Sequence, residues 1–426
     1  MGTIGTAVLS GTIVTGFTGA TASTLTSITI PDSASAIGDN VFLGCTALTS
    51  VSIPDSVTRF GDSVFRGCTA LTSVSIPDSV TRIENNAFRN CSSLGTFTGE
   101  SVGFLGDNVF VNCFALTKVD LPQVTSIGRS VFNNCDVLAE INVPKVITLD
   151  NWVFAGLRKL TNIDLPEVTS LEREVFREAI ALKSVSLPKV NFIPYFTFKS
   201  CSALTSIYIP EVTSADYAAF TGTGLITVDM PKLTEIPQAA FDGCTKITSI
   251  DLPHVTSIGI EAFRGCTALK TVSLLNVTTI GVNTFQNCTS LTGVKVSPSV
   301  TIDPTAFTGC TSLNPIVTGT TYDATKSYVN DTKLKTIIIP YSIKTLPSGA
   351  FSGCTGLTTA VFLKPSFVSS FPPDLFKGCK SLKNVEFDSF NPPTSIGLDV
   401  FTDTPYITTW ASTVALLMNN GVDVAE

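Results

Sequence analysis

The sequence predicts an α/β solenoid, and three observations point to this fold class. Each of the twelve cysteines stands three residues after a phenylalanine, as Cys45 follows Phe42 and Cys68 follows Phe65. These phenylalanines recur mostly every 22 or 23 residues. Between them lie short apolar segments that end in proline, as in LTSVSIP. A fixed period of this length is typical of a solenoid, in which each turn stacks on the one before.

One turn, residues 71–91, shows the elements that each turn is expected to contain. Segment 71–76 (LTSVSI) ends in an alternation of apolar and small polar residues, which predicts a strand. Pro77 ends the strand because it has no backbone N–H for a ladder. A short helical or 3-10 stretch is expected around Ala87 and Phe88, and Phe88 is predicted to be the main core side chain.

The cysteines are predicted to be buried free thiols that act as small apolar side chains. Equivalent side chains of successive turns point the same way, whereas a disulfide needs its two Cβ vectors to converge. Leu157, Ala179 and Thr223 replace cysteine in three turns, which indicates a requirement for size and not for redox chemistry. Metal ligands must also converge on one point, so no metal site is expected.

The two ends of the repeat array depart from the repeat. Residues 1–29, with Phe17, are predicted to be a degenerate first turn or N-terminal cap, and residues 30–402 the solenoid. An irregular turn is expected near 314–333, which lacks Phe and Cys. Residues 403–426 are predicted to be a C-terminal cap, with 410–418 as a helix over the last turn, because an uncovered end would expose apolar core.

Composition excludes some partners and leaves the location open. Charged residues make up 14% of the chain and the net charge is −7, which disfavours nucleic acid. No stretch is apolar over the roughly 18 residues of a membrane span. The N-terminus lacks the positively charged start of a signal peptide, although Met1-Gly2 with Thr6 matches the loose N-myristoylation pattern. The missing signal and the free thiols favour an intracellular or particle-associated location.

In segment 71–91, LTSVSIPDSVTRIENNAFRNC, the chain resembles the BspA-like leucine-rich repeats. Repeats of that family combine an LxxIxIP strand with an I-x-x-x-A-F-x-x-C segment. The resemblance implies a right-handed leucine-rich-repeat array of about 17 turns of 22–23 residues. It also implies a parallel β-sheet on one face and short helical, 3-10 or irregular segments on the other. Family members are often surface or secreted proteins associated with adhesion.

Exposed strand positions offer a candidate binding patch. At the fifth strand position, successive turns begin with small hydroxyl residues and then carry four carboxylates and one aromatic residue. Two interpretations stay open: a contact patch for a basic protein surface, or the ordinary solvation of an exposed strand face. Two neighbouring aspartates are too few oxygen ligands for a good calcium site. The candidate residues are Asp120, Asp164, Tyr208, Asp229 and Asp251.

The residue after the proline is predicted to form a ladder of opposite charges across neighbouring turns. Its members are Lys145, Glu167, Lys189, Glu211 and Lys232. We interpret the alternation as a register device, because slipping by one turn would place like charges together. His254, the single histidine of the chain, occupies the same exposed slot and is therefore not expected to be catalytic.

The sequence contains no catalytic motif, so we expect neither an enzyme nor a bound cofactor. The first functional hypothesis is a non-catalytic macromolecule-binding solenoid, a protein-interaction or adhesion scaffold that uses its extended sheet face. The alternative is a structural component of a large cellular or viral assembly. The expected partner is a protein, either a host or surface protein or the neighbouring subunits of an assembly.

Overall fold

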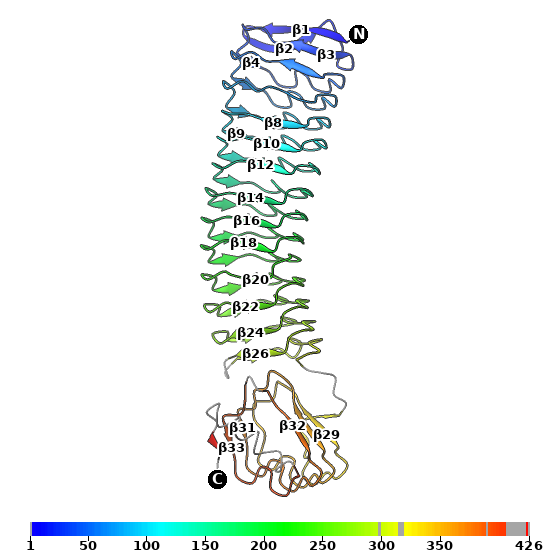
Figure 1. Cartoon of the computed structure of the whole chain (residues 1–426), viewed down its shortest axis with the longest axis vertical. Helices are drawn as coiled ribbons and strands as arrows, with labels where there is room; N and C mark the ends of the chain where they lie inside the picture. Colours follow the sequence, from blue (N-terminus) through cyan, green and yellow to red (C-terminus); the bar gives the residue numbers. More distant parts are fainter. Residues whose placement is uncertain (1, 297–299, 314–318, 389–390, 406–422, 425–426) are drawn as a thin grey trace. The chain divides into compact units, whose positions relative to one another are not determined.

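The structure is a computed structural model that describes residues 2–296, 300–313, 319–388, 391–405 and 423–424 (Figure 1). The chain divides into two compact units, Met1–Lys246 and Ile247–Glu426, which are described separately. Both units are parallel β-solenoids, as the repeat predicts. The described residues contain strands and turns and no helix.

The first face of unit 1, called here the main sheet, is a series of short parallel strands that fall into separate hydrogen-bonded groups. The strand expected at 71–76 is not formed, and these residues have no regular secondary structure. Neighbouring turns pair in register, so that Val119 pairs with Phe97 on one side and with Ile141 on the other. The middle residue of a strand faces the core and its two neighbours face outward, because successive side chains alternate. The strands are β3 (Leu25–Thr29), β5 (Ser50–Ser52), β8 (Thr96–Thr98), β10 (Lys118–Asp120), β12 (Glu140–Asn142), β14 (Asn162–Asp164), β16 (Ser184–Ser186), β18 (Ser206–Tyr208) and β20 (Thr227–Val228).

Unit 1 also has a second parallel sheet, which the sequence pattern does not predict. Each of its strands is two residues long and in most turns places one apolar side chain in the core, as Ile83 and Leu105 do. Such short strands escape a search for alternation, which needs at least four residues. They are β4 (Ala36–Ile37), β6 (Arg59–Phe60), β7 (Arg82–Ile83), β9 (Phe104–Leu105), β11 (Ser126–Ile127), β13 (Thr148–Leu149), β15 (Ser170–Leu171), β17 (Phe192–Ile193), β19 (Ser214–Ala215) and β21 (Glu235–Ile236).

The N-terminal residues form an antiparallel hairpin, where the sequence predicts a degenerate turn or cap. β1 (Thr3–Ser10) pairs with β2 (Ile13–Thr18). β1 also pairs with β3 of the main sheet, and β2 with β4 of the second sheet, which gives the strand order β5-β3-β1-β2-β4-β6. The hairpin therefore joins the edges of the two sheets and leaves neither edge unpaired at this end.

The core of unit 1 is a column of stacked phenylalanine rings. Neighbouring ring centroids lie 5.2–5.9 Å apart and the planes differ by 4–22°. Offset parallel rings are a favourable aromatic geometry. Phe17 of the hairpin begins the column by stacking on Phe42, so the predicted start of the repeat at Phe17 is retained inside the unexpected hairpin.

The phenylalanine-bearing side of each turn is irregular, and the helical or 3-10 stretch expected around Ala87 and Phe88 is not confirmed. The N–H of Phe65 donates to the carbonyl of Ala87 and the N–H of Phe88 to that of Val109, so these groups bond the next turn. Residues with positive φ, such as Asn86 and Asn90, also interrupt each turn. Both features prevent the i→i−4 bonding of a helix.

Unit 2 contains the same kind of turn. Its main-sheet strands are β22 (Ser249–Asp251), β24 (Thr271–Leu274), β26 (Gly293–Val296), β28 (Thr320–Thr321), β29 (Thr336–Ile339), β30 (Thr359–Phe362) and β32 (Asn384–Glu386). The second-sheet strands are β23 (Ser257–Ile258), β25 (Thr279–Ile280), β27 (Thr301–Ile302), β31 (Ser370–Phe371), β33 (Ser395–Ile396) and β34 (Asp423–Val424). The predicted helix at 410–418 lies outside the described residues.

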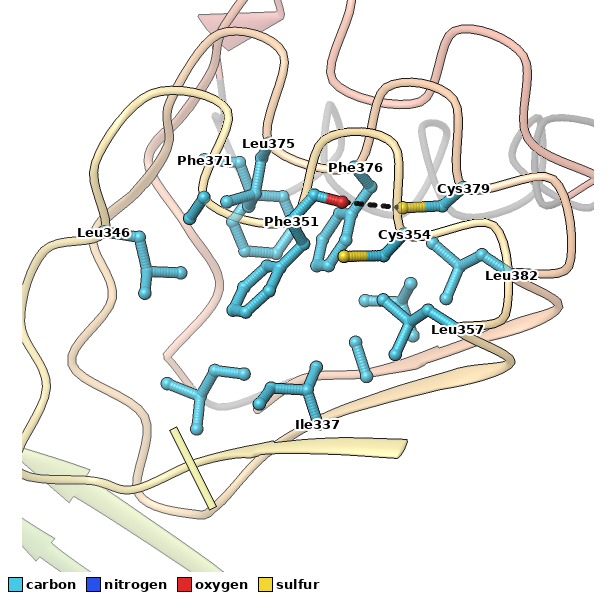
Figure 2. Close-up of a cluster of buried hydrophobic side chains, with 14 of the residues drawn as sticks. Ile337, Leu346, Phe351, Cys354, Leu357, Phe371, Leu375, Phe376, Cys379 and Leu382 are labelled. Carbon is cyan, nitrogen blue, oxygen red and sulfur yellow. Dashed lines mark hydrogen bonds between the residues drawn. The ribbon is translucent and has the colours of Figure 1, made fainter. Parts of the chain in front are cut away.

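The irregular turn expected near 314–333 follows the repeat over its described part. Tyr328 takes the place of the missing phenylalanine, and the Cys354 thiol donates to the Tyr328 carbonyl at 2.8 Å. One turn later, the Cys379 thiol donates to the Phe351 carbonyl at 3.0 Å (Figure 2). The tyrosine for phenylalanine exchange explains why a search for Phe and Cys finds no repeat there.

Candidate binding face

Three outward residues of the main sheet lie side by side in unit 1. Asp164 in β14 pairs with Ser186 in β16, and Ser186 pairs with Tyr208 in β18. Two strand spacings separate the first from the third, about 10 Å between their backbones. Asp164 is exposed and Tyr208 is 59% exposed, an unusually large exposure for an aromatic side chain. The structure therefore brings together two of the five predicted patch residues.

A shallow hollow of about 410 Å³ lies over these strands. Its floor includes Ile141 and Ile207, strand residues that are only half-buried. Its rim carries the Asp164 carboxylate, the hydroxyl of Ser186 and the ring of Tyr208. This hollow suits an extended protein segment that carries a cationic side chain, because it combines an apolar floor with hydroxyl groups, one carboxylate and one aromatic ring.

Asp120 belongs to a different polar group, on the preceding group of main-sheet strands, β8, β10 and β12. The Asn142 amide donates to its carboxylate at 2.8 Å, and Lys118 forms an ion pair with Glu140 at 3.4 Å beside it. Both contacts link one turn to the next. Asp120 therefore takes part in holding the turns in register and does not line the hollow.

The other two predicted patch residues are not brought to this place. Asp229 follows β20 and is exposed in unit 1. Asp251 ends β22 in unit 2, where its backbone pairs with Ser273, and its side chain is not described. Within the described ranges, no three His, Cys, Asp or Glu side chains converge so that they could hold a metal ion.

The predicted charge ladder is present as separate pairs. Lys189 contacts Glu167 at 2.6 Å, and Lys232 contacts Glu211 at 2.6 Å, each across one turn. Lys145 donates to the side chain of Gln123 at 2.6 Å. These side chains are about half exposed, so each pair adds little stability, yet the sequence of charges still disfavours a slip by one turn. His254 is exposed in the corresponding slot of unit 2.

The twelve cysteines are free and buried, as predicted. Burial raises the pKa of the thiols of Cys45 and Cys244 to about 11 and those of Cys135 and Cys201 to about 12. A thiol that stays protonated at neutral pH is a poor nucleophile and a poor metal ligand. These four thiols are therefore core side chains that stay protonated at neutral pH.

Sequence reasoning missed two surface features, one of which lies on the second sheet that it did not predict. A hollow of about 390 Å³ lies over β9, β11, β13 and β15, with Phe104 and Glu172 among its lining residues. A cluster of aromatic rings lies further along the chain at a corner of the turns, where Tyr195 and Tyr217 stack at 5.5 Å and Phe196 contacts both. The slot of Tyr195 holds polar residues in the preceding turns, so this change was visible in the sequence.

Comparison with known proteins agrees with this architecture. The family model described as "BspA type Leucine rich repeat region (6 copies)" matches residues 17–139, 125–248, 234–358 and 324–413. A leucine-rich repeat protein from Bacteroides ovatus shares 23% identity and a TM-score of 0.55, over 99% of this chain and 97% of that one. A leucine-rich cell surface protein from Faecalibacterium prausnitzii shares 26% identity and a TM-score of 0.41, over 89% and 94% of the two chains.

No curated protein sequence matches the chain significantly. In the part of the chain that the structure describes, no helix is long and apolar enough to cross a bilayer.

Proposed function

The chain belongs to the BspA-type leucine-rich repeat family, and from this premise we propose that it is a non-catalytic protein-binding scaffold. The main sheet of unit 1 is the binding face, and the hollow between Asp164 and Tyr208 is its centre. The narrower form of the proposal is adhesion, in which the bound protein lies on another cell or surface.

The exposure of Tyr208 is the observation that supports this proposal most directly. Its neighbours in register, Ser186 and Asp164, are small or charged, as expected of a solvated strand face. A large aromatic side chain that is 59% exposed leaves more than half of its surface in water at this place. Tyrosine is, in contrast, among the residues that contribute most to protein–protein interfaces.

The charge of the hollow indicates the chemistry of the partner. Asp164 forms no ion pair with another described residue, and the hollow has no cationic side chain on its lining. A lysine or arginine of a partner could contact this carboxylate and the Tyr208 ring in the same groove. The partner segment is therefore expected to be basic and extended.

The proposal is tested by affinity capture from an extract of the native source with the immobilised full chain. We expect a set of proteins that the variants Tyr208→Ser and Asp164→Asn retain about tenfold less well, since truncating a central interface residue removes 1 kcal/mol or more. Tyr217→Ser, which removes an exposed tyrosine of the corner cluster, is the matched control. Equal retention by all variants would contradict the proposal and favour an assembly component held by other surfaces.

A further inference from the structure

The N-terminal hairpin carries no charged side chain. The first 31 residues contain no Asp, Glu, Lys, Arg or His, and the first charged side chain is that of Asp32. Since 14% of the chain is charged, about four charged residues would be expected in a stretch of this length. Natural proteins usually place charges on exposed strands because they prevent association. Their absence at the end of a solenoid needs an explanation.

The outer face of the hairpin exposes apolar side chains. Ile4 is 72% exposed and Val8 40% exposed on β1, and Ile13 is 45% exposed on β2. Thr6 and Thr18, a cross-strand pair, are exposed beside them. The face is therefore made of branched apolar side chains and short hydroxyl side chains, without a long polar residue.

Much of the hairpin backbone is already paired within the solenoid. β1 pairs with β2 over Thr6–Ser10 and with β3 over Thr3–Thr6, and β2 also pairs with β4 at Ile13 and Val14. This pairing shortens the free strand edges that charges would protect. The pairing of the backbone does not explain why the side chain of Ile4 is mostly exposed to water. A partner that covers Ile4 would contact this face through side chains.

We propose that this face binds a second copy of the chain, hairpin against hairpin, about a two-fold axis. An uncharged face of branched apolar and hydroxyl side chains places no like charges against one another in a two-fold contact, where the same surface meets itself. The 27 basic and 34 acidic residues all lie beyond it and leave a net charge of −7, so two copies repel one another through the remaining surface. A highly charged partner would lose hydration on this face and gain no ion pair.

The size of the face determines how strong the contact can be. Two strands of eight residues or fewer present about 260 Å² per copy at standard strand dimensions. Stable interfaces bury about 800 Å² per partner, so the dimer is expected to be weak. Salt should strengthen it, because screening reduces the repulsion between two chains of net charge −7 while an apolar contact loses nothing.

Sedimentation velocity of the full chain from about 10 µM to about 1 mM tests the proposal. We expect a shift from monomer to dimer that increases with added NaCl. Ile4→Lys should weaken the association at least about tenfold, because the two-fold axis brings two lysines together. Ile180→Lys changes an equally apolar residue, 40% exposed, outside the hairpin and should leave the association unchanged. Circular dichroism checks the fold, and Thr6→Lys is a second variant should Ile4→Lys not fold.

A cross-link shows whether the hairpin is the contact. The native thiols are buried, so a cysteine introduced by Thr6→Cys would be the exposed one available to a mild oxidant. We expect a disulfide-linked dimer from Thr6→Cys and none from Ser52→Cys on the main sheet. A chain that stays monomeric at every concentration would overturn the proposal. So would a dimer that Ile4→Lys does not weaken or that salt dissociates.

Discussion

The thiol of Cys135 donates a hydrogen bond to the backbone carbonyl of Phe110, one turn earlier, with an Sγ–O distance of 3.1 Å. The same contact joins neighbouring turns at Cys68, Cys91, Cys113, Cys201, Cys244, Cys288, Cys310, Cys354 and Cys379. The cysteine therefore fills space and also donates a second hydrogen bond to a carbonyl that already accepts one from a backbone N–H, as the Phe110 carbonyl does from Cys113. This second role explains why cysteine and not alanine is the usual residue in the slot.

The raised thiol pKa predicts that the protein loses stability in alkaline solution. Burial holds the pKa of Cys135 at about 12, against 9.0 for an unperturbed thiol. Between these values the unfolded chain releases a proton that the folded chain retains, so the free energy of unfolding falls as pH rises through this window. For one thiol the loss at pH 10 is about 1.4 kcal/mol. Urea unfolding at pH 7 and pH 10 should show a correspondingly smaller loss for Cys135→Ala than for the parent. An equal loss in both proteins would contradict the structural role of this thiol.

The stacked rings predict a large cost for removing one of them. Phe132 is fully buried between Phe110 and Phe154, with ring centroids 5.7 and 5.8 Å away. Phe132→Ala should lower the free energy of unfolding by about 3–5 kcal/mol, because it removes buried surface and leaves a cavity. Phe114→Ala, at a half-exposed position, should change it by less than about 0.5 kcal/mol. Urea unfolding of the two variants measures this difference. Equal unfolding midpoints would contradict the placement of Phe132 in a buried column of stacked rings.

The residue that precedes the cysteine position of a turn has a left-handed backbone conformation. We therefore expect two substitutions at this position to change the stability in opposite directions. Gly156 has φ of 75° and open space around an added Cβ, so Gly156→Ala should cost about 1 kcal/mol from backbone strain alone. Glu178 holds the same conformation at φ 60° in the turn where Ala179 replaces cysteine. Glu178→Asn should raise the melting temperature, since asparagine tolerates this conformation better. Its exposed ion pair with Arg177 adds little that would be lost. Calorimetry should show a lower melting temperature for Gly156→Ala and a higher one for Glu178→Asn. A Gly156→Ala variant that melts at a higher temperature than the parent would contradict the left-handed backbone at this residue.

The pairing of Glu167 with Lys189 predicts a small, salt-dependent coupling. A double-mutant cycle with Glu167→Ala and Lys189→Ala should give about 0.2–1 kcal/mol, because the pair is half exposed. The coupling should fall as NaCl is raised, since screening acts on exposed charges. A coupling that is absent at low salt would show that the alternation has no role in register.

The sequence alone predicts the repeating parts of the fold, but it does not predict the N-terminal hairpin or the short strands of the second sheet. The repeat predicts the solenoid, the buried thiols and the charge pairs because each of these features recurs at one position of successive turns. The N-terminal hairpin occurs once, and only Phe17 shares the repeat. The two-residue strands of the second sheet, such as Arg82–Ile83, are too short to give a pattern. The binding face was predicted as five residues on one line, whereas the structure groups Asp164 with Tyr208.

The most direct test of the central claim is photo-cross-linking from position 208. The full chain would carry p-benzoylphenylalanine in place of Tyr208, or in place of Tyr217 as a control on another surface, and would be irradiated in an extract of the native source. We expect one protein to be captured from position 208, not from position 217, and to be lost when Asp164→Lys is added. Capture of the same proteins from both positions, or of none from position 208, would contradict a binding face on the main sheet.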